Sequence, residues 1–214
     1  TLKCYMADTG LLISHAFDEN GIVSEEIYKK LLFDKLSVNS GMLMENIVNC
    51  ATDPELRRHT FENDLGYNPK QMGMAKQFVR HWDEFKKDSM GLLLWGPVGT
   101  GKSFIAGCIA NALLDQGVPV MMTNFARLLN KLTDMYAGDR NAYIDNFNSF
   151  PLLIIDDLGT ELPGQFVTAA LYSLVNDRLL AGKPMVISTN LNVDELAKRY
   201  SPQIASRLHG SFAR

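Results

Sequence analysis

A glycine-rich segment near the middle of the chain has the residue types and the spacing of a phosphate-binding loop. Its residues are Gly96, Pro97, Val98, Gly99, Thr100, Gly101, Lys102 and Ser103, which fit the P-loop pattern G-x-x-x-x-G-K-[ST]. Glycines allow backbone turns in which consecutive N–H groups point at phosphate oxygens. The pattern assigns the Lys102 ammonium to the β- and γ-phosphates of a nucleotide and the Ser103 hydroxyl to Mg²⁺.

The segments on either side of this loop are those that a P-loop requires. Residues 92–95 form a short apolar run before it, and residues 103–114 can form a helix after it. The positive N-terminal end of such a helix attracts phosphate. The alternative is a glycine-rich turn without a ligand, and the flanking strand and helix favour the nucleotide site.

Two adjacent carboxylates follow a second apolar run. Residues 152–155 read Leu-Leu-Ile-Ile and lead directly into Asp156 and Asp157. A buried parallel strand delivers the residues at its carboxyl end to the ligand edge of the sheet. We expect Asp156 to hold Mg²⁺ through water and Asp157 to orient or deprotonate the attacking water. An acidic turn that merely ends a strand is the alternative.

Two polar residues later in the chain are further candidates. Asn190 follows an apolar run and could hydrogen-bond the attacking water or the γ-phosphate. The alternative is that it caps the next helix, although Asn192 with Glu195 already supplies such a cap. Arg207 lies near the end of a short helix that opens at Pro202. An arginine there can serve the phosphate of a neighbouring subunit, and a solvent-facing side chain is the alternative.

Apolar runs and amphipathic helices alternate over residues 91–214. The expected strands are 92–95, 119–122, 152–155 and 185–188, and the expected helices include 103–114, 126–136 and 166–180. This alternation predicts an α/β fold with a parallel sheet flanked by helices on both faces. A further helix, with apolar residues at helical spacing between 75 and 85, should pack on this sheet.

The composition is that of an ordinary globular protein. Hydrophobic residues make up 46% and charged residues 21% of 214 residues, with a net charge of −3. The charge argues against a broad nucleic-acid-coating surface but allows a local basic patch. Because no apolar run reaches the length of a membrane span, no membrane partner is expected. Three widely separated cysteines predict reduced thiols and a cytoplasmic protein.

These pieces, in this order, resemble the AAA+ ATPases, a branch of the P-loop NTPases. The longer string resembles the DnaC/IstB-like group of helicase loaders and transposition helper ATPases. It comprises residues 61–64 (Phe-Glu-Asn-Asp), 92–103, 124–126 (Asn-Phe-Ala) and 154–159 (Ile-Ile-Asp-Asp-Leu-Gly). The resemblance implies that Lys102 and Ser103 are Walker A, Asp156 and Asp157 are Walker B, Asn190 is sensor 1, and Arg207 is an arginine finger.

The resemblance also implies partners and a role. Members of the group use ATP and Mg²⁺ as a switch in rings or spirals, so homo-oligomers through Arg207 are expected. Their partners are a replicative DNA helicase or a transposase, and single-stranded DNA. We therefore predict an ATPase acting in DNA replication as a helicase loader, with a transposition helper as the alternative. An ATP-binding module without turnover and a P-loop phosphotransferase also stay open.

The chain departs from the pattern in two ways. Many AAA+ proteins carry Asp-Glu where this chain has Asp156 and Asp157, so we expect slow turnover. The chain ends at Arg214, before the fifth core strand, the sensor 2 arginine and the helical lid that the resemblance implies. We therefore expect a C-terminally truncated core.

The predicted organisation has three parts. Residues 91–214 form the ATP-binding core, and residues 51–90 form a linker and an N-terminal helix. Residues 1–50, a short α/β segment, resemble a fragment of an uncharacterised C-terminal domain from another family of prokaryotic AAA ATPases. A divergent N-terminal extension is the alternative.

Residues 124–150 combine basic and aromatic side chains, which can track a single strand and stack its bases. They include Arg127, Lys131, Arg140, Phe125, Tyr136, Tyr143 and Phe147. DNA contact is one interpretation of this segment. The alternative is that the aromatic residues join the core beneath the helix.

Overall fold

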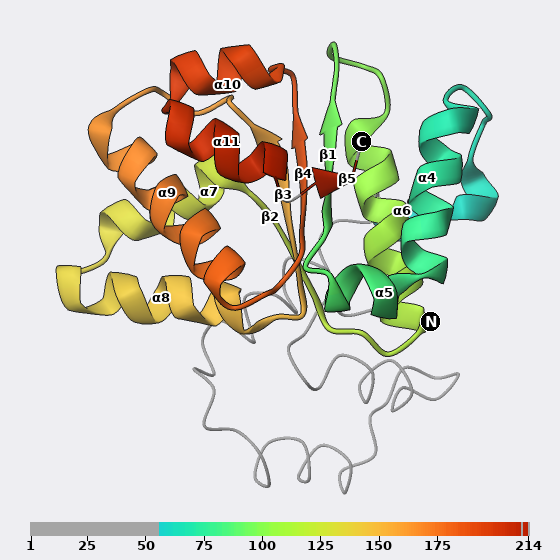
Figure 1. Cartoon of the computed structure of the whole chain (residues 1–214), viewed down its shortest axis with the longest axis horizontal. Helices are drawn as coiled ribbons and strands as arrows, with labels where there is room; N and C mark the ends of the chain where they lie inside the picture. The colour runs from blue at the N-terminus through green and yellow to red at the C-terminus, as the bar shows by residue number, and fades with distance from the viewer. Residues whose placement is uncertain (1–55, 211, 214) are drawn as a thin grey trace, which may run out of the picture.

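Five parallel strands form the central sheet in the order β2-β3-β4-β1-β5. The computed structural model describes residues 56–210 and 212–213, so the predicted segment 1–50 lies outside the described residues. The strands are β1 (Gly91–Trp95), β2 (Val120–Asn124), β3 (Leu152–Leu158), β4 (Met185–Thr189) and β5 (Phe212–Ala213). Because all run parallel, their carboxyl ends lie along one edge of the sheet (Figure 1).

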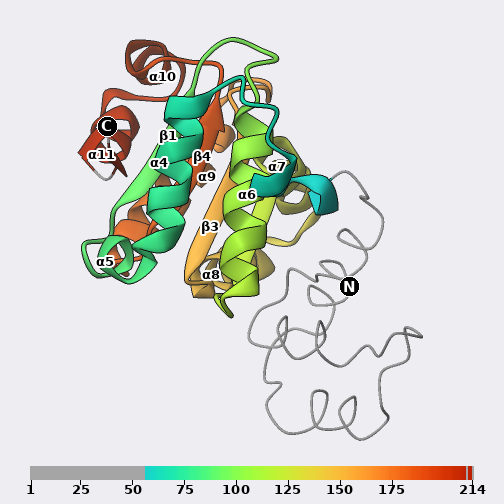
Figure 2. The ribbon, with the colours of Figure 1, turned by 90° about the vertical axis from the view of Figure 1, so that its right-hand side faces the viewer.

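Helices cover both faces of the sheet (Figures 1 and 2). One face carries α4 (Pro69–Arg80), α5 (Trp82–Lys87) and α6 (Lys102–Asp115). The other carries α7 (Phe125–Asp134), α8 (Ala137–Ser149), α9 (Gln165–Leu180), α10 (Val193–Arg199) and α11 (Pro202–Gly210). Two short 3₁₀ helices, Leu56–Arg58 and Phe61–Asn63, precede α4. This is the three-layer α/β architecture that the sequence predicts.

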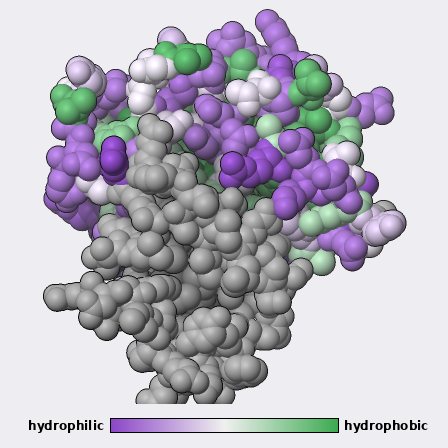
Figure 3. All heavy atoms as spheres, turned by 180° about the vertical axis from the view of Figure 1, so that it is seen from behind, coloured by the Kyte–Doolittle hydropathy of each residue, from purple (hydrophilic) through white to green (hydrophobic). Residues whose placement is uncertain are grey.

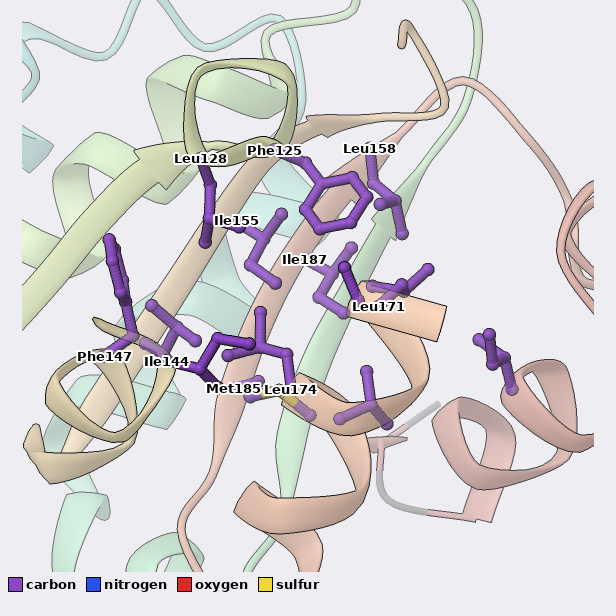
Figure 4. Packing of buried hydrophobic residues seen from close by; sticks show 14 of the residues in the cluster. Phe125, Leu128, Ile144, Phe147, Ile155, Leu158, Leu171, Leu174, Met185 and Ile187 are labelled. Carbon is purple, nitrogen blue, oxygen red and sulfur yellow. The ribbon is translucent and has the colours of Figure 1, made fainter. Parts of the chain in front are cut away.

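The strands are continuously apolar because both of their faces are buried. Along β3, Leu152 and Ile154 pack in the core beneath α4–α6, whereas Leu153 and Ile155 pack in the core beneath α7–α11. Figure 4 shows the second core, where side chains of α7, α8 and α9 meet those of β3 and β4. Where coloured atoms are visible from behind, the surface is mostly hydrophilic, with hydrophobic residues scattered among the polar ones (Figure 3).

A buried arginine fastens the edge of the sheet opposite the carboxyl ends. Arg178 of α9 is fully buried, and its guanidinium donates to the carbonyls of Phe147, Phe150, Pro151 and Pro184 at 2.7–3.2 Å. Burial lowers the pKa of Arg178 to about 9, so the group stays charged at neutral pH. Arg178 therefore ties the turn before β3 to the turn before β4, and so aligns the two strands.

The predicted elements are confirmed, with three differences. The helix expected around residues 75–85 is divided at His81 into α4 and α5. Helix α8 was not among the predicted helices, because its few large apolar residues stand among many polar ones. The fifth core strand does not lie wholly beyond the chain as expected, since β5 already pairs with Gly91 and Leu92. Two residues are too few for a sequence pattern to reveal a strand.

None of the described helices is long and apolar enough to cross a membrane.

Candidate functional site

The glycine-rich loop connects β1 to α6, as the sequence predicts. Gly99 and Gly101 have φ values of 79° and 77°, in the left-handed region that side chains with a Cβ rarely adopt. Gly101 is the N-cap of α6, and the helix begins at Lys102. The loop therefore ends with the N-terminal turn of a 14-residue helix directed at its interior.

Lys102 bends back over this loop. Its ammonium donates to the carbonyls of Gly96 at 2.9 Å and Pro97 at 2.8 Å, and the residue is only 9% exposed. The loop thus already holds a cation at the position where the pattern requires one. An entering phosphate would replace these neutral carbonyl acceptors with anionic oxygens, so that both partners of each bond would be charged.

A cavity of about 680 Å³ adjoins the loop. Among its lining residues are Asn68, Met74, Trp95, Thr100, Lys102 and Val193. Such a volume is typical of small-molecule sites. The lining combines apolar side chains and the exposed Trp95 ring with the Lys102 ammonium, which suits a ligand with a flat ring and an anionic group.

The acidic pair lies at the carboxyl end of β3, with Asp156 in register with Asn124 of β2. The pairing between β3 and β4 shifts register between Ile155 and Leu158. Within this irregularity Asp157 has a φ of 53°, uncommon for a residue other than glycine. Such a bulge can re-aim a side chain.

Ser188 of β4 holds both acidic residues. Its hydroxyl donates to Asp156 Oδ1 and accepts the backbone N–H of Asp157 at 2.9 Å. Sequence reasoning missed this fully buried serine. The sequence does contain a signal: Ser188 ends an apolar run and precedes the polar residues Thr189 and Asn190. A polar side chain buried in such a strand needs a hydrogen-bond partner.

The surroundings raise the pKa of the Asp157 carboxyl above its usual value of 3.8. Burial is the larger cause, repulsion from Asp156 adds to it, and the Lys102 ammonium opposes both. A carboxylate whose proton affinity is raised is better suited to accept a proton from water.

The last residues of β4 also contact the P-loop. The Gly96 N–H donates to the Thr189 carbonyl at 3.3 Å, and the Thr189 hydroxyl donates to the Leu158 carbonyl at 2.6 Å. Asn190 follows at the same edge of the sheet and is exposed. Asn192 and Glu195 form the predicted capping box of α10, so Asn190 is not needed as that cap.

Arg207 lies on the face of the sheet that carries α9. Its guanidinium stacks over the ring of Tyr172 in α9, 4.7 Å from the ring centroid, and the side chain is half-buried. Arg207 is therefore held against α9, and its role towards a neighbouring subunit stays a prediction. The contact places Arg207 beside a partly exposed aromatic ring on an outer surface of the domain.

Of the two interpretations of the region 124–150, the structure supports the core for three of its four aromatic residues. Phe125, Tyr143 and Phe147 are buried, because they fill the core between the helices and the sheet. Arg140 donates to the carbonyls of Leu132 and Met135, at 2.8 and 3.2 Å. Of the residues named for DNA contact, Arg127, Lys131 and Tyr136 are exposed.

A buried acidic residue, also missed from the sequence, orders the loop after β3. Glu161 accepts the hydroxyl of Tyr200 and the N–H of Gly159 at 3.1 Å, and Arg199 lies 3.6 Å from its carboxylate. Burial and the Glu161 contact raise the pKa of Tyr200. The loop that follows the acidic pair is therefore tied to the end of α10.

The sequence of the chain matches a known family. Residues 13–205 fit the model of the IstB-like ATP binding proteins. The chain belongs to this family. It is therefore an ATP-binding AAA+ protein of the DnaC/IstB type, as the motifs predict. The match begins within residues 1–50, and the proposed origin of that segment stays a prediction.

Relatives and solved structures agree with this placement. The replicative helicase loader DnaC of Escherichia coli K12 is 23% identical over 174 residues, 79% of this chain and 71% of that protein. An ATP-binding protein in an insertion sequence of Mycobacterium tuberculosis is 31% identical over 136 residues, 61% of this chain and 53% of that protein. Crystal structures of DnaI and of the DnaC helicase loader superpose with TM-scores of 0.67 and 0.68. DnaI is 23% identical in sequence, and the match covers 76% of this chain and 92% of the DnaI chain. The DnaC helicase loader is 17% identical, and the match covers 75% of this chain and 97% of the DnaC chain. Both structures confirm the P-loop fold.

Replacing Asp157 tests the acidic pair. Asp157→Asn keeps the shape and removes the charge, so hydrolysis should fall about 10²- to 10⁴-fold while ATP affinity stays nearly unchanged. The exposed Asp145 of α8 gives the control, Asp145→Asn, which should match the parent. Equal hydrolysis by parent and Asp157→Asn would exclude the catalytic role.

The same variant tests the electrostatics. In the folded protein the pKa of the Asp157 carboxyl lies above its ordinary value of 3.8. The folded state is therefore favoured while this carboxyl is protonated, and it loses that stability as the pH rises through the raised pKa. Asp157→Asn should therefore melt slightly above the parent at pH 7, and this difference should shrink as pH falls towards 3.8.

Proposed function

We propose that the protein hydrolyses ATP slowly, with Mg²⁺, and acts in DNA replication as a helicase loader. One observation supports this most directly: Ser188 and Thr189, at the end of β4, contact the acidic pair and Gly96 of the P-loop respectively. Lys102, the first residue of α6, and Asp157 could then act on the same phosphate. A module that only held ATP would not need the second group.

The donor set suits magnesium, which prefers oxygen ligands. Ser103 lies in the first turn of α6, and Asp156 Oδ1 is taken by Ser188. We assign the Ser103 hydroxyl to the metal and Asp156 Oδ2 to a metal-bound water. The ion would neutralise charge on the β- and γ-phosphates.

Within this account, Asp157 orients the attacking water and Asn190 contacts the γ-phosphate or that water. Asp157 is one methylene shorter than the glutamate common at this position in AAA+ proteins. A shorter side chain holds water less closely, and we therefore expect slow turnover, suited to a switch.

The proposed partner is a replicative helicase, because several relatives bear the name of a replicative helicase loader. The relative from an insertion sequence keeps a transposition helper as the second candidate, with a transposase as partner. A structural neighbour, DnaA, was solved with single-stranded DNA, which supports DNA as a third ligand. Binding to a purified helicase, compared with binding to a transposase, separates the two candidates.

Lys102→Ala tests ATP binding at the loop. Loss of the charged hydrogen bonds should weaken ATP affinity at least about 10- to 100-fold and remove most of the ATP-dependent rise in melting temperature. Lys198→Ala, on the exposed surface of α10, is the control and should keep that rise. An unchanged rise in Lys102→Ala would show that ATP binds elsewhere.

We also propose that Arg207 acts on the nucleotide of a neighbouring subunit. Its helix packs against α9 and α10, and its stack on Tyr172 holds the guanidinium at a partly exposed surface. A head-to-tail assembly would bring this surface to the P-loop of the next copy. Arginine fingers stabilise transition-state charge and accelerate hydrolysis by about 10³-fold or more.

Mixing two inactive variants tests this role. Arg207→Ala and Lys102→Ala should each be nearly inactive, yet a Lys102→Ala subunit can lend its Arg207 to the intact P-loop of its neighbour. Activity should therefore return in the mixture and rise with protein concentration. Absence of rescue at every ratio, with hydrolysis per molecule independent of concentration, would refute the role in trans.

A further inference from the structure

The segment before α4 lies along α6 (Figure 2). We call residues 56–68 the strap. Near its start, the Asn111 amide of α6 donates to the carbonyls of Leu56 and His59, at 2.9 and 2.8 Å. His59 packs so closely that a Cβ added at Gly107 would lie 2.4 Å from its Nδ1 atom. The strap is thus seated on the helix that begins at the P-loop.

The end of the strap contacts the P-loop itself. The Asn68 amide donates to the carbonyl of Thr100 at 2.9 Å, across 32 residues of sequence. Asn68 occupies the N-cap position of α4, but its side chain makes no capping bond there. The Asn68 side chain could cap the backbone N–H groups of α4, but it contacts the P-loop instead.

This hydrogen bond fixes the direction of one peptide unit. In a planar trans peptide, the carbonyl of one residue and the N–H of the next point in opposite directions. When Asn68 holds the Thr100 carbonyl on the strap side, the Gly101 N–H is directed away from the strap. Gly101 has φ 77°, and without a side chain it could otherwise rotate at little cost.

We propose that Asn68 is a positioning residue that orients the Gly101 N–H towards the phosphates of the bound nucleotide. The proposal rests on ATP binding at the P-loop and adds how the loop is kept ready. It also makes the strap a route by which the chain before α4 affects nucleotide affinity. A shift of the strap by about an ångström would lengthen a 2.9 Å bond beyond hydrogen-bonding distance.

Asn68→Ala tests the proposal, with ATP and adenosine as the two ligands. Loss of one neutral hydrogen bond that orients the loop should raise the Kd for ATP roughly three- to tenfold. Adenosine lacks phosphates, so its Kd should change little. Asn130→Ala is the matched control, because Asn130 is an exposed asparagine of α7, outside the strap. This control should leave the Kd for ATP unchanged.

The other outcomes are decisive. Equal losses for ATP and adenosine would overturn the proposal, because Asn68 would then act as a wall of the cavity that it lines. An unchanged Kd for ATP would overturn it too. If Asn68→Ala does not fold, Asn68→Ser keeps a capping residue whose hydroxyl is too short to reach Thr100, and the same loss is expected. Parent protein that fails to bind ATP would instead refute the proposed function.

Discussion

The carboxyl end of β4 joins the two halves of the nucleotide site. β4 lies between β1, which leads into the P-loop, and β3, which carries the acidic pair. Thr189 accepts the N–H of Gly96, while Ser188 contacts Asp156 and Asp157. These bonds hold the phosphate-binding loop and the carboxylates at a fixed separation. Arg178 fixes β3 and β4 at the opposite edge, so the strand ends have little freedom to shift.

Much of this arrangement could be predicted because it depends on local spacing. The P-loop pattern requires a strand, glycines and a helix within a short stretch, and each leaves its own residue type in the sequence. The acidic pair is marked in the same way by the apolar run before it. Asn192 and Glu195 form the cap that their three-residue spacing predicts. In each case the residues that interact are near neighbours in the chain.

The interactions that could not be predicted join residues distant in sequence. Asn68 meets Thr100, and Ser188 meets Asp156, only once the strands and helices have packed. The positive φ of Asp157 depends on a register shift against β4, which no local pattern encodes. Phe147 was misleading for a related reason. An aromatic residue among basic ones is also typical of a DNA-binding surface, and only the packing of the helices on the sheet places Phe147 in the core.

Ser188→Ala tests most directly whether β4 holds the site together. The account predicts that hydrolysis falls about tenfold or more and that more Mg²⁺ is needed, because Asp156 loses the hydroxyl that orients it. ATP affinity without Mg²⁺ should stay near that of the parent. Ser173→Ala is the control, since that hydroxyl donates to Asp177 on α9, away from the site. Hydrolysis at the parent rate, with the parent's Mg²⁺ requirement, would contradict the account.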